Sequence, residues 1–372
     1  MYMDELRVII SGGGTGGHIF PAVSIANALR EINPDVKILF VGAEGRMEMQ
    51  RVPAAGYEII GLPVRGLIRP LWKPANIGVL KDFLKSKRMV KQTLRDFKPH
   101  VAVGVGGYAS SATLDAAYEL GIPCLIQEQN SFAGLTNKRL AKKASKICVA
   151  YEGMERFFPK DRILLTGNPV RQNLLNDSLT KQECADAFGL SATKPTVLII
   201  GGSLGAKTIN ESVIRNLSRI AASSAQFIWQ TGSNYKKEIE NTLDVKVKPT
   251  NLIVTDFIGR MDQAYHLADL VISRAGASSI SELCLLGKPS ILVPSPNVAE
   301  DHQTHNAMAL VGRQAALIVR DADTPEQLIP LALETVADTD KLQELGKNAA
   351  AMALRDSARI IAEEVIKLAK KD

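Results

Sequence analysis

A glycine-rich segment followed by a histidine has the residue types that group-transfer chemistry requires. It runs from Ser11 to His18 as SGGGTGGH, directly after the apolar run 6–10. Glycines between a strand and a helix let backbone N–H groups approach an anionic ligand. An imidazole at the end of such a turn can accept a proton from a sugar hydroxyl. We therefore expect a ligand-binding turn with His18 as a general base, although a helix-capping histidine without chemistry would fit the same position.

The same glycines allow a second interpretation. Gly12, Gly14 and Gly17 match GxGxxG, and Glu44 follows the next apolar run, so a dinucleotide-binding oxidoreductase is an alternative. A nicotinamide site has no need of an imidazole at His18, whereas an attacking hydroxyl needs a base. The histidine therefore favours hydroxyl activation over hydride transfer.

A second glycine-rich turn, residues 201–206 (GGSLGA), follows the apolar run 196–200. Its N–H groups and the Ser203 hydroxyl could bind a diphosphate without a metal ion, with help from the dipole of the next helix. A turn that binds nothing is the alternative. Two such turns at corresponding places in the two halves of the chain favour ligand binding.

The segment 274–282 (RAGASSISE) again lies between an apolar run and a helix-forming stretch. Ala277, Ser278 and Ser279 would occupy the first helical turn, where N–H groups favour phosphate. Glu282 could accept hydrogen bonds from two ribose hydroxyls, although a capping or surface glutamate is also compatible. A polar group suited to sugar recognition follows the next apolar run: Asp301, His302, Gln303 and Asn306. His302 and His305 fit solvated loop positions better than metal ligands.

Short apolar runs alternate with helix-forming segments in both halves of the chain. The runs are 6–10, 36–41, 101–105 and 124–127, then 196–200, 227–230, 252–254, 270–273 and 290–293. This alternation predicts two doubly wound α/β domains that face one another across a cleft. We expect a domain at 1–165, completed by a C-terminal helix at 356–372, and a second domain at 166–355. Ligands should bind beyond the carboxyl ends of the strands.

The bulk composition indicates an ordinary cytoplasmic protein. The chain has 372 residues, of which 46% are hydrophobic and 23% are charged. It has no run near the ~20 apolar residues of a membrane-spanning helix and no secretory signal pattern. Four cysteines without a CxxC pair predict buried free thiols, and we expect neither a zinc site nor a cofactor.

The positive charge is concentrated in one segment. Residues 65–98 hold ten lysines and arginines against two aspartates, a formal charge of +8 in a chain of net charge +6. Apolar residues lie among them: Leu67, Ile68, Leu71 and Trp72, followed by Ile77, Leu80, Leu84 and Leu94 at helical spacing. We expect an anionic membrane surface as the partner, with insertion near 67–72 and the helix as electrostatic support. A stripe that packs on the domain core is the alternative. Nucleic acid is disfavoured because no aromatic platform is interleaved.

Six motifs together resemble the family of lipid-II-forming N-acetylglucosaminyltransferases. They are GGGTGGHIFPAVSIANAL, GVGGYAS, QEQNSFAGLTNK, GNPVR, GGSLGAKTIN and RAGASSISE, in family order from residue 12 to about 307. The resemblance implies a GT-B fold with an N-terminal acceptor domain and a C-terminal UDP-sugar domain. It also implies inverting transfer of N-acetylglucosamine from UDP-N-acetylglucosamine to the 4-hydroxyl of N-acetylmuramic acid in lipid I. The products would be lipid II and UDP, made at the cytoplasmic face of the inner membrane by a peripheral enzyme.

The resemblance also assigns residues to the two substrates. On the acceptor side it implies Gly14, Thr15, Gly16, Tyr108, Asn130 and Asn137, with N–H groups of 14–16 on the diphosphate. On the donor side it implies Thr15, Gly16, Gly17, Asn130, Arg171, Ser203, Gly205, Ala206, Phe257, Ile258, Ala277, Ser278, Ser279, Glu282 and Gln303. Phe257 and the Ile258 backbone would contact uracil, Glu282 the ribose, and Gln303 the transferred sugar.

The general base and two departures from the family pattern stay as hypotheses. We expect His18 to be the base, with Glu128 as the alternative, and Arg171 to stabilise the leaving diphosphate without a metal ion. Gln127 stands where many relatives have histidine, and Leu204 where glutamine is frequent. Another GT-B enzyme, such as a glycolipid galactosyltransferase or a UDP-sugar 2-epimerase, is the remaining alternative. The GGTGGH and QEQN segments together argue against it.

Overall fold

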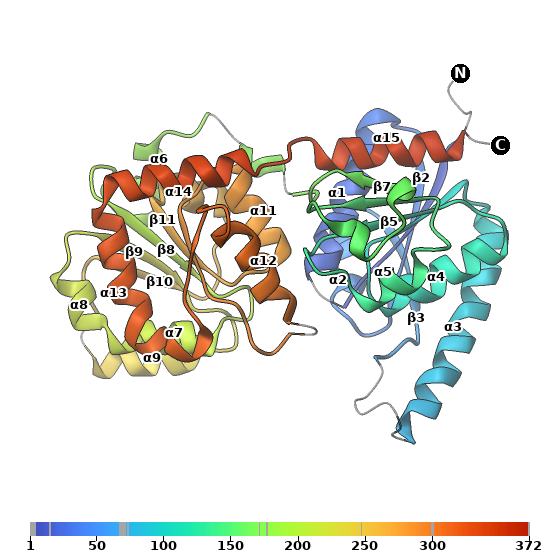
Figure 1. Cartoon of the computed structure of the whole chain (residues 1–372). Coiled ribbons are helices and arrows are strands. Elements are labelled where there is room, and N and C mark those ends of the chain that lie inside the picture. The colour runs from blue at the N-terminus through green and yellow to red at the C-terminus, as the bar shows by residue number, and fades with distance from the viewer. Residues whose placement is uncertain are drawn as a thin grey trace. The chain divides into compact units, whose positions relative to one another are not determined.

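The chain divides into two compact units, each with its own parallel sheet (Figure 1). The computed structural model describes residues 5–14, 16–66, 72, 74–170, 172–175, 178–246, 248–298 and 301–370. Unit 1 comprises Met1–Arg171 and Leu354–Asp372, and unit 2 comprises Gln172–Ala353. Among the described residues, no helix is long and apolar enough to cross a membrane.

The sheet of unit 1 has seven parallel strands in the order β3-β2-β1-β4-β5-β6-β7. Their bounds are β1 Arg7–Ser11, β2 Lys37–Ala43, β3 Glu58–Leu62, β4 Val101–Gly104, β5 Cys124–Glu128, β6 Lys146–Val149 and β7 Ile163–Leu165. The strand order reverses between β1 and β4, which pair directly. In doubly wound sheets, the carboxyl ends of strands at such a reversal form the ligand-binding edge.

Helices cover both faces of this sheet: α1 Gly16–Ile32, α2 Glu48–Ala54, α3 Ala75–Phe97, α4 Tyr108–Glu119, α5 Leu135–Leu140 and the C-terminal α15 Ser357–Ala369. Single turns η1 Met154–Arg156 and η2 Lys160–Arg162 precede β7. Successive strand residues point to opposite faces. Val8 and Ile10 therefore join one buried cluster, whereas Ile9 joins the other.

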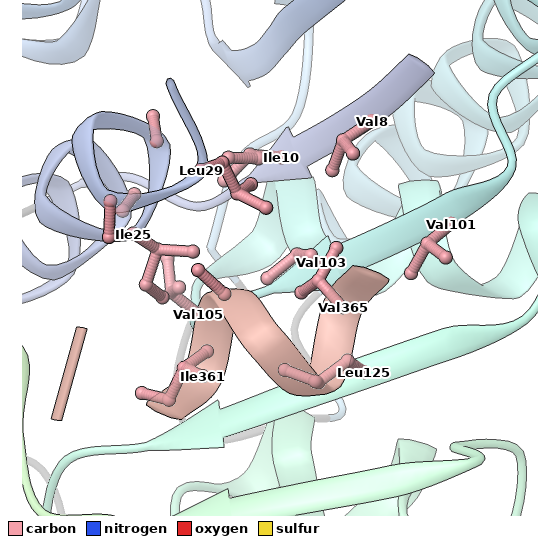
Figure 2. Packing of buried hydrophobic residues seen from close by; sticks show 14 of the residues in the cluster. Val8, Ile10, Ile25, Leu29, Val101, Val103, Val105, Leu125, Ile361 and Val365 are labelled. Carbon is pink, nitrogen blue, oxygen red and sulfur yellow. The ribbon is translucent and has the colours of Figure 1, made fainter. Parts of the chain in front are cut away.

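The C-terminal helix belongs to the core of unit 1. Figure 2 shows Ile361 and Val365 of α15 among strand residues of the same buried cluster, which also contains Leu29 of α1. Burial of one such side chain contributes roughly 1.5–3 kcal/mol. The chain re-enters unit 1 at Leu354, which packs closely against Gly167. An added Cβ on Gly167 would lie 2.6 Å from the Cβ of Leu354.

The sheet of unit 2 has six parallel strands in the order β10-β9-β8-β11-β12-β13. The strands are β8 Thr196–Ile200, β9 Gln226–Gln230, β10 Leu252–Thr255, β11 Leu270–Ser273, β12 Ser290–Leu292 and β13 Leu317–Ile318. The helices are α6 Lys181–Phe188, α7 Lys207–Arg215, α8 Leu217–Ala222, α9 Lys236–Val245, α10 Met261–Leu267, α11 Ala277–Leu285, α12 His302–Val311, α13 Thr324–Ala337 and α14 Thr339–Ala351, with turns η3 Gln172–Leu175 and η5 Asp321–Asp323. The reversal between β8 and β11 repeats that between β1 and β4.

The four cysteines are free and buried, as predicted. Burial raises the pKa of the Cys124, Cys148 and Cys284 thiols to about 12. These side chains therefore serve as small apolar core residues rather than as nucleophiles.

Candidate active site

The glycines of the first turn are required by close packing at the carboxyl end of β1. A Cβ on Gly12 would lie 2.1 Å from Val105 Cγ2, and one on Gly13 would lie 2.0 Å from Glu48 Oε1. Gly14 has φ +87°, a conformation that L side chains rarely adopt. Thr15 lies outside the described residues.

The Glu48 side chain packs against this turn and accepts a hydrogen bond from it. The side chain is completely buried, and its carboxylate accepts the Gly14 N–H at 3.2 Å (Oε1) and 3.1 Å (Oε2). Oε1 also accepts the Ala43 N–H at 3.0 Å. The Gly14 N–H thus donates to a carboxylate within the protein, whereas the sequence predicts a diphosphate as its partner.

Glu48 was not among the residues that the sequence singled out. The candidate acid there was Glu44, which is exposed and whose backbone N–H donates to Leu62 O at 2.9 Å. Glu48 begins α2, and an acid in a first helical turn is ordinarily explained by the helix dipole. The sequence therefore offers no signal that this carboxylate turns inward to the glycine turn.

His18 lies in the first turn of α1 and is half-buried. Its Nδ1 is 2.9 Å from Gly13 O. A carbonyl oxygen only accepts hydrogen bonds, so Nδ1 carries the hydrogen and Nε2 is the basic nitrogen of the neutral ring. A Cβ on Gly106 would lie 2.9 Å from Nε2, so the imidazole packs closely against this glycine.

Glu128, at the end of β5, is a buried carboxylate with four donors. Oε1 accepts from Asn130 N at 3.0 Å and Asn130 Nδ2 at 3.2 Å, and Oε2 accepts from Gly134 N at 3.0 Å and Asn137 Nδ2 at 2.9 Å. Glu128 therefore fixes the loop that carries the two asparagines. The Asn137 Oδ1 is buried and has no hydrogen-bond partner among the described residues.

Further polar groups gather at the same edge of the unit 1 sheet. Tyr108 begins α4 and is half exposed, and a Cβ on Gly66 would lie 2.8 Å from its hydroxyl. Gln127, the departure from the family pattern, is buried and donates to Asn168 Oδ1 at 3.0 Å. Gly16 and Gly17 stand in the first turn of α1.

The second glycine turn, after β8, is interlocked with the end of β9. A Cβ on Gly205 would lie 2.1 Å from Thr231 O, and one on Gly232 would lie 2.0 Å from Gly205 N. Both glycines have positive φ, +87° and +84°. Ser203 O accepts the Ser233 N–H at 3.1 Å, which closes the turn against the next loop. Ala206 follows as the residue before α7.

Gln230 connects this turn to the loop after β10. The buried side chain donates from Nε2 to Gly202 O at 3.1 Å and accepts the Ile258 N–H at Oε1 at 3.0 Å. The adjacent Phe257 side chain is 56% exposed. Gln230 ends an apolar strand and carries no sequence signal of this role.

The start of α11 presents a buried polar side. Ala277 is buried, and the Ser278 Oγ is buried with no hydrogen-bond partner in the part of the chain that the structure describes. Glu282 is also buried, and its Oε2 accepts from Tyr265 OH at 3.2 Å. Glu282 is thus not the surface glutamate of the alternative interpretation.

The remaining candidates lie at the start of α12 or outside the described residues. Gln303 Oε1 accepts the Ser295 N–H at 2.9 Å, and Asn306 Nδ2 donates to Ala275 O at 3.4 Å. Both side chains thereby tie α12 to loops at the carboxyl edge of the sheet. Arg171 falls outside the described residues.

Two doubly wound parallel units, each with a glycine-rich turn after its first strand, define a glycosyltransferase of the GT-B class. Residues 8–149 match the "Glycosyltransferase family 28 N-terminal domain", and residues 196–361 match the "Glycosyltransferase family 28 C-terminal domain". Two relatives, from Bacteroides fragilis and Phocaeicola vulgatus, are 60% and 61% identical over 99% of this chain and cover 97% and 98% of their own lengths. The chain belongs to glycosyltransferase family 28, among proteins named "UDP-N-acetylglucosamine--N-acetylmuramyl-(pentapeptide) pyrophosphoryl-undecaprenol N-acetylglucosamine transferase".

Solved structures agree with this class. The crystal structure of Acinetobacter baumannii MurG superposes with a TM-score of 0.77 at 28% identity, covering 97% of this chain and 99% of that one. A UDP-GlcNAc 2-epimerase from Neisseria meningitidis, bound to UDP-GlcNAc, has a TM-score of 0.67 at 14% identity and covers 98% of this chain and 100% of its own. The second likeness shows the shared fold alone. Membership of the glycosyltransferase family decides against the oxidoreductase and the nucleic-acid binder.

Proposed function

We propose that this protein transfers N-acetylglucosamine from UDP-N-acetylglucosamine to the 4-hydroxyl of N-acetylmuramic acid in lipid I, with inversion, to give lipid II and UDP. The names of relatives about 60% identical over nearly the whole chain support the substrates. The observation that carries the mechanism is the His18 hydrogen bond to Gly13 O, which leaves Nε2 as the basic nitrogen. In this step, Nε2 takes the proton of the acceptor hydroxyl as its oxygen attacks the anomeric carbon.

On the acceptor side, Glu128 acts as a positioning residue rather than as the base. Four hydrogen-bond donors already surround its carboxylate, so taking a proton from substrate would disrupt the loop that it holds. Asn130, Asn137 and Tyr108, with the turn residue Gly16, then contact the acceptor. The buried and unpartnered Asn137 Oδ1 supports a polar ligand there, since such atoms are costly when unsatisfied.

On the donor side, the leaving diphosphate binds to backbone N–H groups and helix starts. The turn at 203–206 and the first residues of α11, Ala277 to Ser279, supply N–H groups where helix dipoles favour anions. Glu282 accepts the ribose hydroxyls, and Gln303 contacts the sugar. Arg171, Gly17 and Thr15 complete the predicted donor contacts.

The uracil contact falls on Phe257 and on the backbone of Ile258. Because Gln230 already accepts the Ile258 N–H, the Ile258 carbonyl is the group that accepts a hydrogen bond from the base. The exposed Phe257 ring offers an apolar surface beside it.

The amphipathic helix α3 supports a membrane-docking surface, though not as predicted. Ile77, Leu80 and Leu84 are 63%, 59% and 51% exposed, whereas Leu94 is buried on the core. The four residues thus do not form one stripe. Leu94 lies on the face of α3 that packs on the unit, with Val79, Phe83 and Val90, whereas Ile77, Leu80 and Leu84 lie on another face. The N-terminal end of α3 extends beyond the rest of the unit (Figure 1). Trp72 is 84% exposed. Leu67, Ile68 and Leu71 lie outside the described residues.

Basic residues flank the projecting apolar face. Lys81, Lys85 and Arg88 are exposed, whereas Lys87 and Lys91 form ion pairs with Glu119 of α4. Each exposed basic residue near anionic lipid adds about 1 kcal/mol of attraction. We infer that this face holds the enzyme at the cytoplasmic face of the inner membrane, where its lipid-linked acceptor is found.

Vesicle co-sedimentation tests the docking surface. A variant with Lys81→Glu, Lys85→Glu and Arg88→Glu should lose binding to vesicles of anionic phospholipid, and Leu80→Asp should do so as well. Lys341→Glu, in the other unit, is the matched control for charge reversal on a helix. Unchanged co-sedimentation of both α3 variants would contradict the docking surface.

Transfer of labelled sugar tests the proposed reaction. Purified protein is incubated with labelled UDP-N-acetylglucosamine and lipid I, or a short-chain analogue, and lipid II is measured. We expect transfer by the wild type and at least about a tenfold weaker UDP affinity in Glu282→Ala, since a hydrogen bond to a charged group contributes roughly 1.5–3 kcal/mol. Transfer to a different acceptor, with none to lipid I, would discard the proposed substrate and keep the glycosyltransferase fold.

A further inference from the structure

One peptide group lies between Glu48 and His18. The carbonyl of the Gly13–Gly14 peptide accepts a hydrogen bond from His18 Nδ1 at 2.9 Å. The N–H of the same peptide donates to the two Glu48 carboxylate oxygens at 3.2 and 3.1 Å. Carboxylate, peptide and imidazole therefore form one hydrogen-bonded chain, in which each bond polarises the next.

Glu48 is held in place by burial and by a further hydrogen bond. The side chain is completely buried, and Ala43 N, at the end of β2, donates to Oε1 at 3.0 Å. Two glycines make room for it, since a Cβ on Gly42 would lie 2.6 Å from Glu48 Cγ and one on Gly13 would lie 2.0 Å from Oε1. The carboxylate is thus held in place against the run of three glycines, Gly12 to Gly14.

A peptide between two glycines can rotate at low cost, because neither residue has a Cβ to restrict it. Rotation would turn the Gly14 N–H toward His18 Nδ1 in place of the Gly13 carbonyl. Nδ1 would then have to accept a hydrogen bond, which places the imidazole hydrogen on Nε2. In that tautomer Nε2 has no lone pair and cannot take a proton from a hydroxyl.

We propose that Glu48 is a positioning residue that sets the tautomer and orientation of His18 through the Gly13–Gly14 peptide. Its carboxylate holds the Gly14 N–H, which keeps the Gly13 carbonyl directed at His18 Nδ1 and leaves the lone pair on Nε2. The inference rests on the proposed role of His18 as the base. In this role the glycine turn fixes the direction of one peptide group, in addition to providing N–H groups for an anion.

Nitrogen NMR of the histidines in the full-length protein reads the tautomer directly. The chain has five histidines, and a His18→Gln variant assigns the His18 signals. We expect the neutral ring to carry its hydrogen on Nδ1 in the wild type. In Glu48→Met, which has similar volume and no acceptor for the Gly14 N–H, the hydrogen should move toward Nε2. Glu48→Gln should lie between, because its amide oxygen can still accept this N–H.

Steady-state kinetics separates positioning from general structural damage. We expect kcat to fall at least about tenfold in Glu48→Met and less in Glu48→Gln. KM for UDP-N-acetylglucosamine should stay unchanged, because the contacts proposed for the uracil and the ribose lie in unit 2. Glu44→Gln removes one carboxylate at an exposed position of the same loop and should match the wild type in both measurements.

Two results would overturn the inference. One is a wild-type His18 tautomer in both Glu48 variants; the other is a kcat of Glu48→Gln that falls as far as that of Glu48→Met with no change in the His18 signals. Failure of the proposed base role of His18 would look different. His18→Ala would then retain full transfer, while the NMR experiment would still decide whether Glu48 controls the His18 tautomer.

Discussion

The two glycine turns occupy equivalent places in the two units, but different side-chain groups hold them in place. Behind the first turn, the Glu48 carboxylate accepts the Gly14 N–H and places a negative charge under the loop. Behind the second, the neutral Gln230 side chain donates to the Gly202 carbonyl. We call these two side chains the braces of the turns. The first brace, Glu48, engages an N–H group of its turn, whereas the second brace, Gln230, engages a carbonyl and adds no charge.

This difference suggests how one fold serves two substrates. A diphosphate is best bound where N–H groups are available and no carboxylate lies behind them, which describes the second turn. A general base benefits from a nearby fixed acceptor and tolerates a negative charge, which describes the first. We infer that the first turn activates the acceptor hydroxyl and the second receives the leaving diphosphate.

The largest effect is expected from His18→Ala. Loss of the general base should lower kcat by roughly 10²–10⁴-fold, with KM for UDP-N-acetylglucosamine unchanged. Steady-state transfer to a lipid I analogue measures both constants. A KM that rises while kcat holds would assign His18 to substrate binding, and the contrast between the turns would be lost.

The next effect is expected from Gly205→Ala. A methyl group there would lie 2.1 Å from Thr231 O at φ +87°, so the turn must shift and UDP binding should be lost. The free energy of unfolding should also fall by more than about 1 kcal/mol. Calorimetry with UDP and a denaturant titration measure the two changes.

Gly45→Ala is the matched control for that substitution. Gly45 also has positive φ, +68°, but an added Cβ there meets nothing within 4 Å. Its cost should be limited to the backbone term of about 1 kcal/mol, with UDP affinity retained. Equal loss of UDP affinity in both variants would mean that general destabilisation, not the second turn, accounts for the result.

A smaller effect is expected from Gln230→Met, which keeps the volume but removes both hydrogen bonds of the brace. Gly202 O and Ile258 N would be left without this partner, so we expect UDP affinity to fall about tenfold and kcat to change less. Isothermal titration with UDP and with uridine shows whether the affinity is lost at the diphosphate or at the nucleoside. Wild-type affinity for both ligands would show that Gln230 does not position the second turn.

The smallest effect is expected from removal of metal ions. If backbone N–H groups and helix starts stabilise the diphosphate, transfer in excess EDTA should equal transfer without it. Recovery of a lost rate on addition of Mg²⁺ would instead assign the leaving-group role to a cation.

Much of this account could be predicted from the sequence where the signal is local. The glycine turns, the alternating strands and the start of α11 each lie within a few residues of the strand that positions them, so the motif and the structure coincide. Parallel sheets also place strand ends together at one edge, which predicts that His18 and Glu128 share a region. In the sheet of unit 1, β1, which precedes His18, and β5, which ends at Glu128, lie on either side of β4.

The contacts of Glu48 and Gln230 with the two turns could not be predicted, because each contact joins residues that are far apart in the sequence. Glu48 holds an amide 34 residues earlier, and Gln230 holds a carbonyl 28 residues earlier. Nothing in the local pattern distinguishes Glu48 from the exposed Glu44 as the inward-facing acid. The two faces of α3 were equally hidden, since apolar residues at helical spacing lie both on the face that meets the core at Phe83, Val90 and Leu94 and on the exposed face of Ile77, Leu80 and Leu84.

Calorimetric titration of UDP into wild type, His18→Ala and Gly205→Ala, with transfer measured on the same samples, tests the division of roles between the turns most directly. The account predicts wild-type UDP affinity without transfer for His18→Ala, and loss of both for Gly205→Ala. UDP affinity lost in His18→Ala, or retained together with transfer in Gly205→Ala, would contradict it.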